Sequence, residues 1–445
     1  MHGAATVSSV FGLPAIWVAT SLLVATYAAV ISEKINRAVI ALLGASLMVV
    51  LGILTQEKAV EGIDFNTIGL LIGMMVIVAV SRRTGMFEYL AIRSAKLVKA
   101  DPAAIMLMLQ IVTAVVSAFL DNVTTVLLVV PVTLVICDHL GVKPYPFLVA
   151  QVFASNIGGT ATLIGDPPNI LIGSRVGLSF NDFVVNLTPV IIVIQLVACG
   201  LFHVIWGRRF KSTPEARAKV MAFDERSAIV DHTLLVKSLI VLGFVIAGFV
   251  LARQLHVEPA TIALFGASAL LLLSCIGRDA EAQTKIVSKT FEEVEWITIF
   301  FFIGLFIVIY GVEATGLLSI LANKLVELTG GDLRVTVFAV LWASAILSSI
   351  VDNIPFVATM IPLVKDMAPA FGGPEGLMPV WWALSLGACL GGNGTIIGAS
   401  ANLTVAGLAE RAGIRFAFVE YMKVAYPVML ITVALSMIYL ELRYL

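Results

Sequence analysis

The sequence predicts an all-α membrane protein with ten transmembrane helices and two re-entrant hairpins, arranged as an inverted repeat. Three observations support this fold class. Of the 445 residues, 60% are apolar and 13% are charged, whereas about a quarter of the residues of a soluble domain are charged. The apolar residues gather into uncharged runs, and about 20 such residues span a bilayer. Polar motifs interrupt these runs at matching places in the two halves of the chain.

The composition also excludes several functions. A formal charge of −1 gives no reason to expect a nucleic-acid partner. The four cysteines have no paired spacing, which argues against a disulfide framework or a zinc site, and the five histidines form no cluster. No nucleophile–base pair is recognisable either. We therefore expect no enzyme activity, no metal site and no cofactor.

Residues 1–206 are predicted to form the first of two repeats. Their uncharged start is expected to be a helix rather than a signal peptide, because it has no basic segment and no small-residue cleavage pattern. Residues 102–137 predict a hairpin, since two apolar arms flank Asp121-Asn122 and the second arm is short for a span. The crossings are expected at residues 14–31, 36–54, 66–81 and 186–206, with an interrupted crossing at 147–175.

Residues 207–232 are predicted to be a cytoplasmic linker, because they form the one sizeable stretch rich in charges. The second repeat, residues 233–445, contains a hairpin at 333–370. Its crossings are expected at residues 233–252, 257–276, 296–312 and 427–443, with an amphipathic piece at 315–328 and an interrupted crossing at 380–409. With the N-terminus outside, most of the 28 Lys and Arg residues lie on the cytoplasmic side. This topology indicates a multi-pass protein of the cell inner (plasma) membrane.

The two halves carry the same motifs. Residues 117–131 align without a gap to residues 348–362, which places Asp121-Asn122 on Asp352-Asn353. Because each half contains an odd number of crossings, the second half enters the membrane from the opposite face. Interrupted helices at corresponding places in an inverted repeat indicate a secondary transporter with its site near the middle of the membrane.

The four interruptions supply the candidate site. Two are the hairpin tips, where a carboxylate in mid-membrane costs roughly 2.5–3.5 kcal/mol and is expected to face a cavity or a partner. The other two are glycine-rich breaks, where freed carbonyls can hold a cation and half-helix N-termini can hold electron-rich oxygens. The predicted substrate- or ion-binding residues are Asp121, Asn122, Thr124, Asn156, Gly158, Gly159, Thr160, Thr162, Asp166, Asn169, Asp352, Asn353, Gly392, Asn393, Thr395 and Asn402.

Asp166 is the most informative of these residues, because its counterpart in the second half is Ala399. An unmatched ionisable group suggests a proton or cation site, and Asp121 and Asp352 are further candidates for proton coupling. Simpler roles stay open. The Asp-Asn pairs can cap helices, the glycine pairs can allow close helix packing, and Asp166 can lie in a loop at the membrane edge. Cys389 is expected to be a small buried residue rather than a ligand.

These motifs resemble the ion transporter superfamily and, within it, the arsenite-permease and sodium/proton-antiporter family that includes the pink-eyed dilution P protein. The resemblance implies an elevator-type carrier, in which a transport domain of hairpins and broken helices slides against a scaffold domain. In related dicarboxylate carriers the hairpin tips carry Ser-Asn-Thr. Here Asp121 and Asp352 replace the Ser, which argues against a carboxylate substrate because like charges repel. The motifs are the runs at residues 117–125, 156–169, 352–356 and 387–402.

By this resemblance, we expect export of arsenite or antimonite as the neutral trihydroxide, coupled to proton uptake. Asn, Thr and backbone groups suit such a solute, and Asp carboxylates can accept its protons. A Na⁺/H⁺ antiporter, which would use the same oxygens as hard ligands, stays open, as does a carrier of another small anion. A channel would not require paired hairpins. The expected partners are the coupling ion (a proton or Na⁺), the lipid bilayer and, by analogy, a second copy of the chain or a soluble arsenical-pump ATPase.

Overall fold

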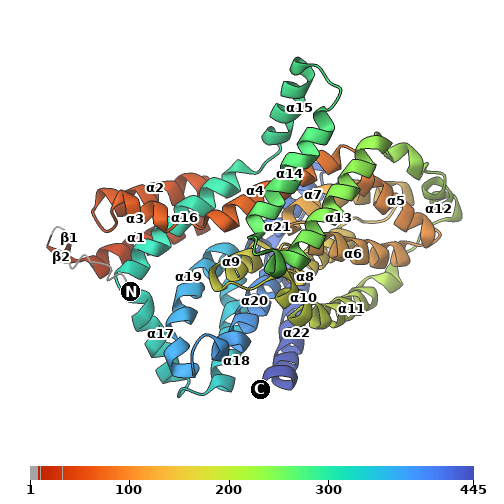
Figure 1. Cartoon of the computed structure of the whole chain (residues 1–445). Helices are drawn as coiled ribbons and strands as arrows, with labels where there is room; N and C mark the ends of the chain where they lie inside the picture. Colours follow the sequence, from red (N-terminus) through yellow and green to blue (C-terminus); the bar gives the residue numbers. More distant parts are fainter. Residues whose placement is uncertain (1–8, 11, 33) are drawn as a thin grey trace.

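The computed structural model describes residues 9–10, 12–32 and 34–445, and Figure 1 shows that helices dominate it. Apart from helices it contains one short antiparallel pair in the described residues, β1 (Ser9–Val10) and β2 (Leu13–Pro14). The prediction of an all-α fold is confirmed. The first half contains α1 (Ala15–Ile31), α2 (Arg37–Val50), α3 (Gln56–Glu61), α4 (Phe65–Arg82), α5 (Met86–Leu97), α6 (Pro102–Phe119), α7 (Asn122–Leu140), α8 (Tyr145–Thr160), α9 (Pro167–Val176), α10 (Phe180–Asn186) and α11 (Thr188–Ile205).

The charged linker holds η1 (Gly207–Arg209), α12 (Pro214–Met221) and η2 (Glu225–Ala228). The second half then repeats the order of the first. It contains α13 (His232–Leu255), α14 (Pro259–Cys275), α15 (Ala280–Glu292), α16 (Trp296–Ala314), α17 (Leu317–Leu328), α18 (Leu333–Ser348), α19 (Asn353–Asp366), η3 (Ala368–Phe371), η4 (Glu375–Leu377), α20 (Met378–Gly391), η5 (Gly392–Gly394), η6 (Ile396–Gly398), α21 (Ser400–Arg411) and α22 (Phe418–Tyr444).

Seven helices of the described chain are long and apolar enough to cross a membrane, namely α4, α6, α7, α11, α13, α16 and α22. Helices α17 and α18 meet at a bend of 119° and would add an eighth span if the pair crosses as one. Three shorter apolar helices, α1, α2 and α14, also match predicted crossings. These findings support a multi-pass membrane protein, and the ten predicted crossings stay a prediction.

The second arm of the first hairpin is longer than we predicted. Helix α7 has 19 residues and runs to Leu140, where Gly141 ends it in a left-handed conformation with φ of +66°. The internal Pro131 and the polar residues Asp138 and His139 do not end the helix. The arm is therefore as long as a crossing, so its length does not distinguish a re-entrant hairpin from two spans.

Two buried helices form the core. Every residue of α8 except the first is buried, and the same holds for α20. Each packs against the first arm of its own hairpin, α8 on α6 and α20 on α18. A side chain at Gly158 would collide with the backbone of Ala114, and one at Gly391 would collide with the backbone of Ala345. The same close contact thus occurs in both halves. Gly158 allows the close helix packing that was given above as a simpler role of the glycine pairs.

The halves interlock through a second pair of matching contacts. Helix α4 of the first half packs on α14 of the second, while α16 of the second half packs on α2 of the first. Glycine makes both approaches close, because a Cβ at Gly73 would meet the backbone of Ala263 and a Cβ at Gly304 the backbone of Ala41. Figure 1 shows α2 and α16 lying side by side at one flank of the molecule. Ala41 of α2 and Ala263 of α14 therefore occupy equivalent positions in the two halves.

Candidate functional site

The two hairpin tips are held by their aspartates. Asp121 caps α7 by accepting a hydrogen bond from the backbone N–H of Thr124 at 2.8 Å, and it also accepts one from the Thr124 hydroxyl. Asp352 caps α19 by accepting one from the N–H of Ile354 at 3.0 Å. Both aspartates therefore satisfy backbone donors that the first turn of a helix leaves free. Their remaining lone pairs are available to other donors.

The broken helices are pinned by one asparagine each. Asn169, on α9, donates from Nδ2 to the carbonyls of Thr160 at 3.1 Å and Thr162 at 2.9 Å. Asn402, on α21, donates in the same way to Gly392 at 2.7 Å and Thr395 at 2.8 Å. These amides bind carbonyls that the end of a helix leaves unpaired, so each closes its own break.

The breaks are in turn tied to the hairpin tips. The hydroxyl of Thr162 donates to the carbonyl of Ala118 in the first hairpin, and the hydroxyl of Thr395 donates to the carbonyl of Ser349 in the second, each at 2.5 Å. Both threonines are buried. Each half thus joins one break rigidly to one tip.

A chain of amides connects the two halves at the centre. Asn122, at the first tip, donates to Oδ1 of Asn156 at 3.0 Å. Asn156 donates to Oδ1 of Asn393 at 3.0 Å and of Asn402 at 2.9 Å. All four side chains are buried. The structure therefore brings together predicted residues from the first tip and both breaks, in a network that carries no charge.

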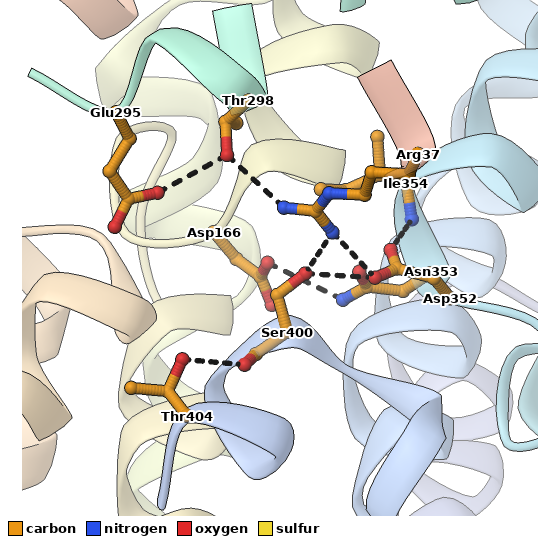
Figure 2. Close-up of polar contacts among 9 residues, drawn as sticks. All are labelled: Arg37, Asp166, Glu295, Thr298, Asp352, Asn353, Ile354, Ser400 and Thr404. Carbon is orange, nitrogen blue, oxygen red and sulfur yellow. Dashed lines mark hydrogen bonds and ion pairs between the residues drawn. The ribbon is translucent and has the colours of Figure 1, made fainter. Parts of the chain in front are cut away.

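Asp166, in the first half, faces Asn353 at the tip of the second hairpin, as Figure 2 shows. It is 0% exposed, and one of its oxygens accepts a hydrogen bond from Nδ2 of Asn353 at 3.4 Å. The other oxygen has no hydrogen-bond partner in the described part of the chain. Asp166 precedes α9 but makes no side-chain capping bond. It is therefore a buried carboxylate with unused acceptor capacity.

A small cavity of about 20 Å³ adjoins Asp166. Asp121, Asn122 and Asn353 line it together with Asp166 and Glu295. A cavity of this size has room for roughly one water molecule. The walls therefore offer carboxylate and amide oxygens to something as small as a water, a proton carrier or a bare cation.

A larger pocket of about 630 Å³ lies beside it. Its lining includes Asp352, Glu295 and the hydroxyls of Thr298, Ser400 and Thr404. The pocket reaches both hairpin tips, because Val123 and Val351 also line it. It is large enough for a small solute and touches the same carboxylates as the cavity.

Arg37 also lines this pocket, although it was not among the residues predicted from the sequence. Its Nη1 donates to Ser400 at 2.7 Å and to Asp352 at 3.4 Å, and its Nη2 donates to Thr298 at 3.1 Å, as Figure 2 shows. Glu295 was missed as well, and it accepts a hydrogen bond from Thr298 at 3.2 Å. The repeat contained a signal for this region, since Thr67 matches Thr298 and Asp64 stands three residues before Thr67 as Glu295 does before Thr298.

The remaining predicted residues face the protein rather than a cavity. Thr160 donates back to the carbonyl of Asn156 at 2.7 Å. A Cβ at Gly159 would meet the carbonyl of Gly165, and one at Gly392 the carbonyl of Gly398 at 3.0 Å. In the described residues, no group of three or more His, Cys, Asp and Glu side chains is placed to hold a metal.

The comparisons with known proteins agree on the class of protein. The citrate transporter family model (CitMHS) matches residues 27–387. An uncharacterized transporter of Mycobacterium tuberculosis (strain ATCC 25618 / H37Rv) is 46% identical, with 96% of this chain and 98% of that protein covered. The P protein of Homo sapiens is 34% identical over 95% of this chain and 59% of its own length.

Solved structures show the same fold. The Alcanivorax borkumensis YdaH transporter superposes with a TM-score of 0.61 at 15% identity, covering 97% of this chain and 99% of that chain. Neisseria gonorrhoeae MtrF superposes with a TM-score of 0.55 at 10% identity, covering 96% and 94%. The resemblance to the ion transporter superfamily and to the P protein branch is confirmed. The chain is a membrane transporter and belongs to the citrate transporter family.

Proposed function

We propose that this transporter is an elevator-type secondary carrier that exports arsenite or antimonite, as the neutral trihydroxide, in exchange for protons. The observation that carries the proposal is the burial of Asp166 between the two halves of the chain. Asp166 is a fully buried carboxylate, and one of its oxygens has no hydrogen-bond partner among the described residues. It contacts Asn353 of the other half, and its own counterpart there is Ala399. A charge in this place is costly unless a proton or a cation accompanies it. Asp166 is therefore suited to take up and release the coupling ion.

The moving part would be the two hairpins with the two broken helices, α6–α9 and α18–α21. The rigid ties within each half support this division, since Thr162 and Thr395 bind each break to its tip. The scaffold would be α1, α2, α4, α13, α14 and α16, in which α2–α16 and α4–α14 pack closely. We further propose that the N-terminus lies outside, so that the pocket of about 630 Å³ opens toward the cytoplasm.

The charges around the site favour a neutral or cationic solute. Asp121, Asp166 and Glu295 line the small cavity and Asp352 lines the pocket beside it, with Arg37 as the basic residue. The family name refers to citrate, but an anionic carboxylate would meet this excess of negative charge. The O–H groups of a metalloid trihydroxide can donate hydrogen bonds to these carboxylates, and the hydroxyls of Ser400 and Thr404 can complete its hydrogen bonds. The pocket has the volume for it.

A second candidate is Na⁺/H⁺ exchange. The cavity of about 20 Å³ favours it, because it fits a bare cation but not a trihydroxide. Its carboxylate and amide oxygens are the hard ligands that such a cation prefers. In that case the larger pocket would be a solvent path and not a substrate site.

Flux through proteoliposomes separates the candidates. The full-length protein is reconstituted, a pH gradient is imposed, and uptake of arsenite, Na⁺ and citrate is measured side by side. We expect arsenite to accumulate only when the gradient is present. Na⁺ movement that ignores arsenite would favour the second candidate, and gradient-driven movement of citrate alone would overturn both.

A further inference from the structure

A single arginine connects the proposed scaffold with the proposed moving part. Arg37 is the first residue of α2, directly after Asn36, whose side chain caps the helix by accepting from Ala38 N–H at 2.9 Å. Its guanidinium lies over the ring of Phe301 on α16, 5.2 Å from the ring centre. The close α2–α16 contact at Gly304 fixes both helices. The arginine is thus anchored on the scaffold side.

Two of the three hydrogen-bond partners of the guanidinium lie on the proposed moving part, while the third, Thr298, lies on α16 of the scaffold. Asp352 is the tip of the second hairpin and Ser400 begins α21 after the second break, and both accept from Nη1 of Arg37. Ser400 also donates to Asp352 at 2.8 Å. A sliding motion of the hairpins against α2 would have to break these bonds. The arginine therefore pairs with Asp352 in one conformation of the carrier.

This ion pair is weakly held and open to solvent. The Arg37–Asp352 distance of 3.4 Å exceeds the 2.7–2.9 Å that is usual for a charge-assisted hydrogen bond. The side chain of Arg37 is 26% exposed and that of Asp352 14% exposed. Both line the pocket of about 630 Å³. An ion that enters the pocket can therefore reach Asp352 and compete with the guanidinium.

Arg37 also offsets part of the negative charge of the site. In the described part of the chain it is the one basic residue that lines either cavity, and it faces four carboxylates, namely Asp121, Asp166, Glu295 and Asp352. A mobile cation near these carboxylates feels the repulsion of the guanidinium. Removing the positive charge while keeping the carboxylates would strengthen cation binding.

The position of the opposite half that matches Arg37 carries no basic residue. Ala41 and Ala263 occupy equivalent positions in the two halves, because each lies against a glycine of the neighbouring helix. Arg37 and Pro259 each stand four residues before these alanines, so they are equivalent as well. The residue before Pro259 is Glu258, where α2 has Asn36. The arginine therefore acts on one face of the carrier.

From these contacts we infer that Arg37 is a tethered counter-ion of Asp352, which the coupling cation must displace on the face that the pocket opens to. The inference rests on the proposed coupling to a proton or Na⁺. The counter-ion makes cation binding weaker in the conformation that opens to this face than in the conformation that opens to the other face, in which Asp352 no longer contacts Arg37. A carrier built this way releases its cation on the Arg37 side.

The test is the cation dependence of thermal stability in the purified full-length protein. The melting temperature is titrated with NaCl against choline chloride at several pH values, for the parent, Arg37→Gln and Arg37→Lys. Arg83→Gln is the matched control, since Arg83 forms a 3.2 Å pair with Glu293 and is 23% exposed. We expect Arg37→Gln to lower the Na⁺ or proton concentration for half-maximal stabilisation by roughly tenfold. Arg37→Lys and Arg83→Gln should keep the parental value.

Thr298→Val provides a second variant in case Arg37→Gln does not fold. It is isosteric and removes the partner of Nη2, so the guanidinium is held less firmly and cation affinity should rise by a smaller factor. Unchanged cation affinity in both Thr298→Val and a folded Arg37→Gln would overturn the inference. So would stabilisation by citrate that Arg37→Gln abolishes, because Arg37 would then bind an anion.

The outcome is independent of the identity of the solute. If the parent carries no arsenite but its cation affinity responds to Arg37→Gln, the arsenite assignment is wrong and the counter-ion stands. If arsenite moves with protons and cation affinity does not respond to Arg37→Gln, the counter-ion is wrong and the proposed function stands.

Discussion

Replacing Asp166 by Asn removes one charge from the centre of the molecule with almost no change in shape. The substituted amide keeps an oxygen that can accept the 3.4 Å hydrogen bond from Asn353, and its NH₂ group occupies the place of the oxygen that has no partner in the described chain. The fold should therefore survive. An isolated buried charge costs several kcal/mol even after the protein relaxes, so we expect Asp166→Asn to be unchanged or more stable by about 1–2 kcal/mol.

Transport should respond in the opposite direction. If Asp166 carries the coupling proton, the amide of the variant cannot take up and release that proton, so the solute has nothing to be exchanged against. Gradient-driven flux should therefore fall by roughly 100-fold or more. The assay is arsenite flux in proteoliposomes with and without a pH gradient, alongside the melting temperature. Glu293→Gln is the control, because it also neutralises a carboxylate, but one that pairs with Arg83 and is not among the residues that line the two cavities. A folded Asp166→Asn protein that keeps full pH-dependent flux would refute this role of Asp166.

Three further predictions concern the parts that support the site. Asn169→Ala and Asn402→Ala each leave two buried carbonyls unpaired and should cost about 2–4 kcal/mol of stability, measured by thermal unfolding. Gly158→Ala forces a methyl group into the backbone of the neighbouring helix and should lower the yield of folded protein in size-exclusion chromatography, whereas Gly200→Ala, with open space around it, should not. A hydrogen bond from Lys96 lowers the pKa of Glu225, in the linker, to about 2 from its ordinary 4.5. Glu225→Gln should therefore lower the melting temperature at pH 7 and lose this effect as the pH falls from about 4.5 toward about 2.

Each of these predictions has a contradicting result. Full stability in both asparagine variants would mean that water replaces the amides at the breaks. A normal yield for Gly158→Ala would show that α6 and α8 can separate at no cost. For Glu225, the sign follows from the lowered pKa, because the stabilisation belongs to the ionised form and is present above the unfolded pKa. An effect of Glu225→Gln that grows as the pH falls would contradict the ion pair.

The central motifs could be predicted because the repeat displays them twice. Asp121-Asn122 matches Asp352-Asn353, and polar residues that recur in apolar surroundings stand out without any structure. The mismatch of Asp166 with Ala399 had the same origin, and the structure places Asp166 fully buried between the halves. Capping by both aspartates also follows from sequence, since Asp before a helix satisfies its free N–H groups.

Arg37 could not be predicted in this way. Its partners Asp352 and Ser400 lie 315 and 363 residues further along the chain, and nothing local distinguishes it from a charge at the end of a span. The repeat does not mark it either, because Pro259 occupies the matching position. A role that depends on contacts between the two halves becomes visible only when both are packed.

Helix α5 shows a second limit of prediction from sequence. Residues 82–101 are rich in charged side chains, whereas the matching residues 315–328 were predicted to be amphipathic. Both segments nevertheless form a helix that starts after a left-handed glycine, Gly85 and Gly316 respectively. The charges of α5 are used by the linker, since Arg93 and Lys96 both pair with Glu225. Polar composition therefore concealed a helix whose charged face is covered by another part of the chain.

Proton movement driven by the solute tests the central proposal most directly. Proteoliposomes holding a pH-sensitive dye are given arsenite outside, with no other gradient, and the pH of the lumen is followed. Because arsenite enters as a neutral molecule, exchange for protons predicts that the lumen of vesicles with the parental protein becomes alkaline, while vesicles with Asp166→Asn show no change. Arsenite entry without any change of pH, or an equal response from both proteins, would contradict proton exchange through Asp166.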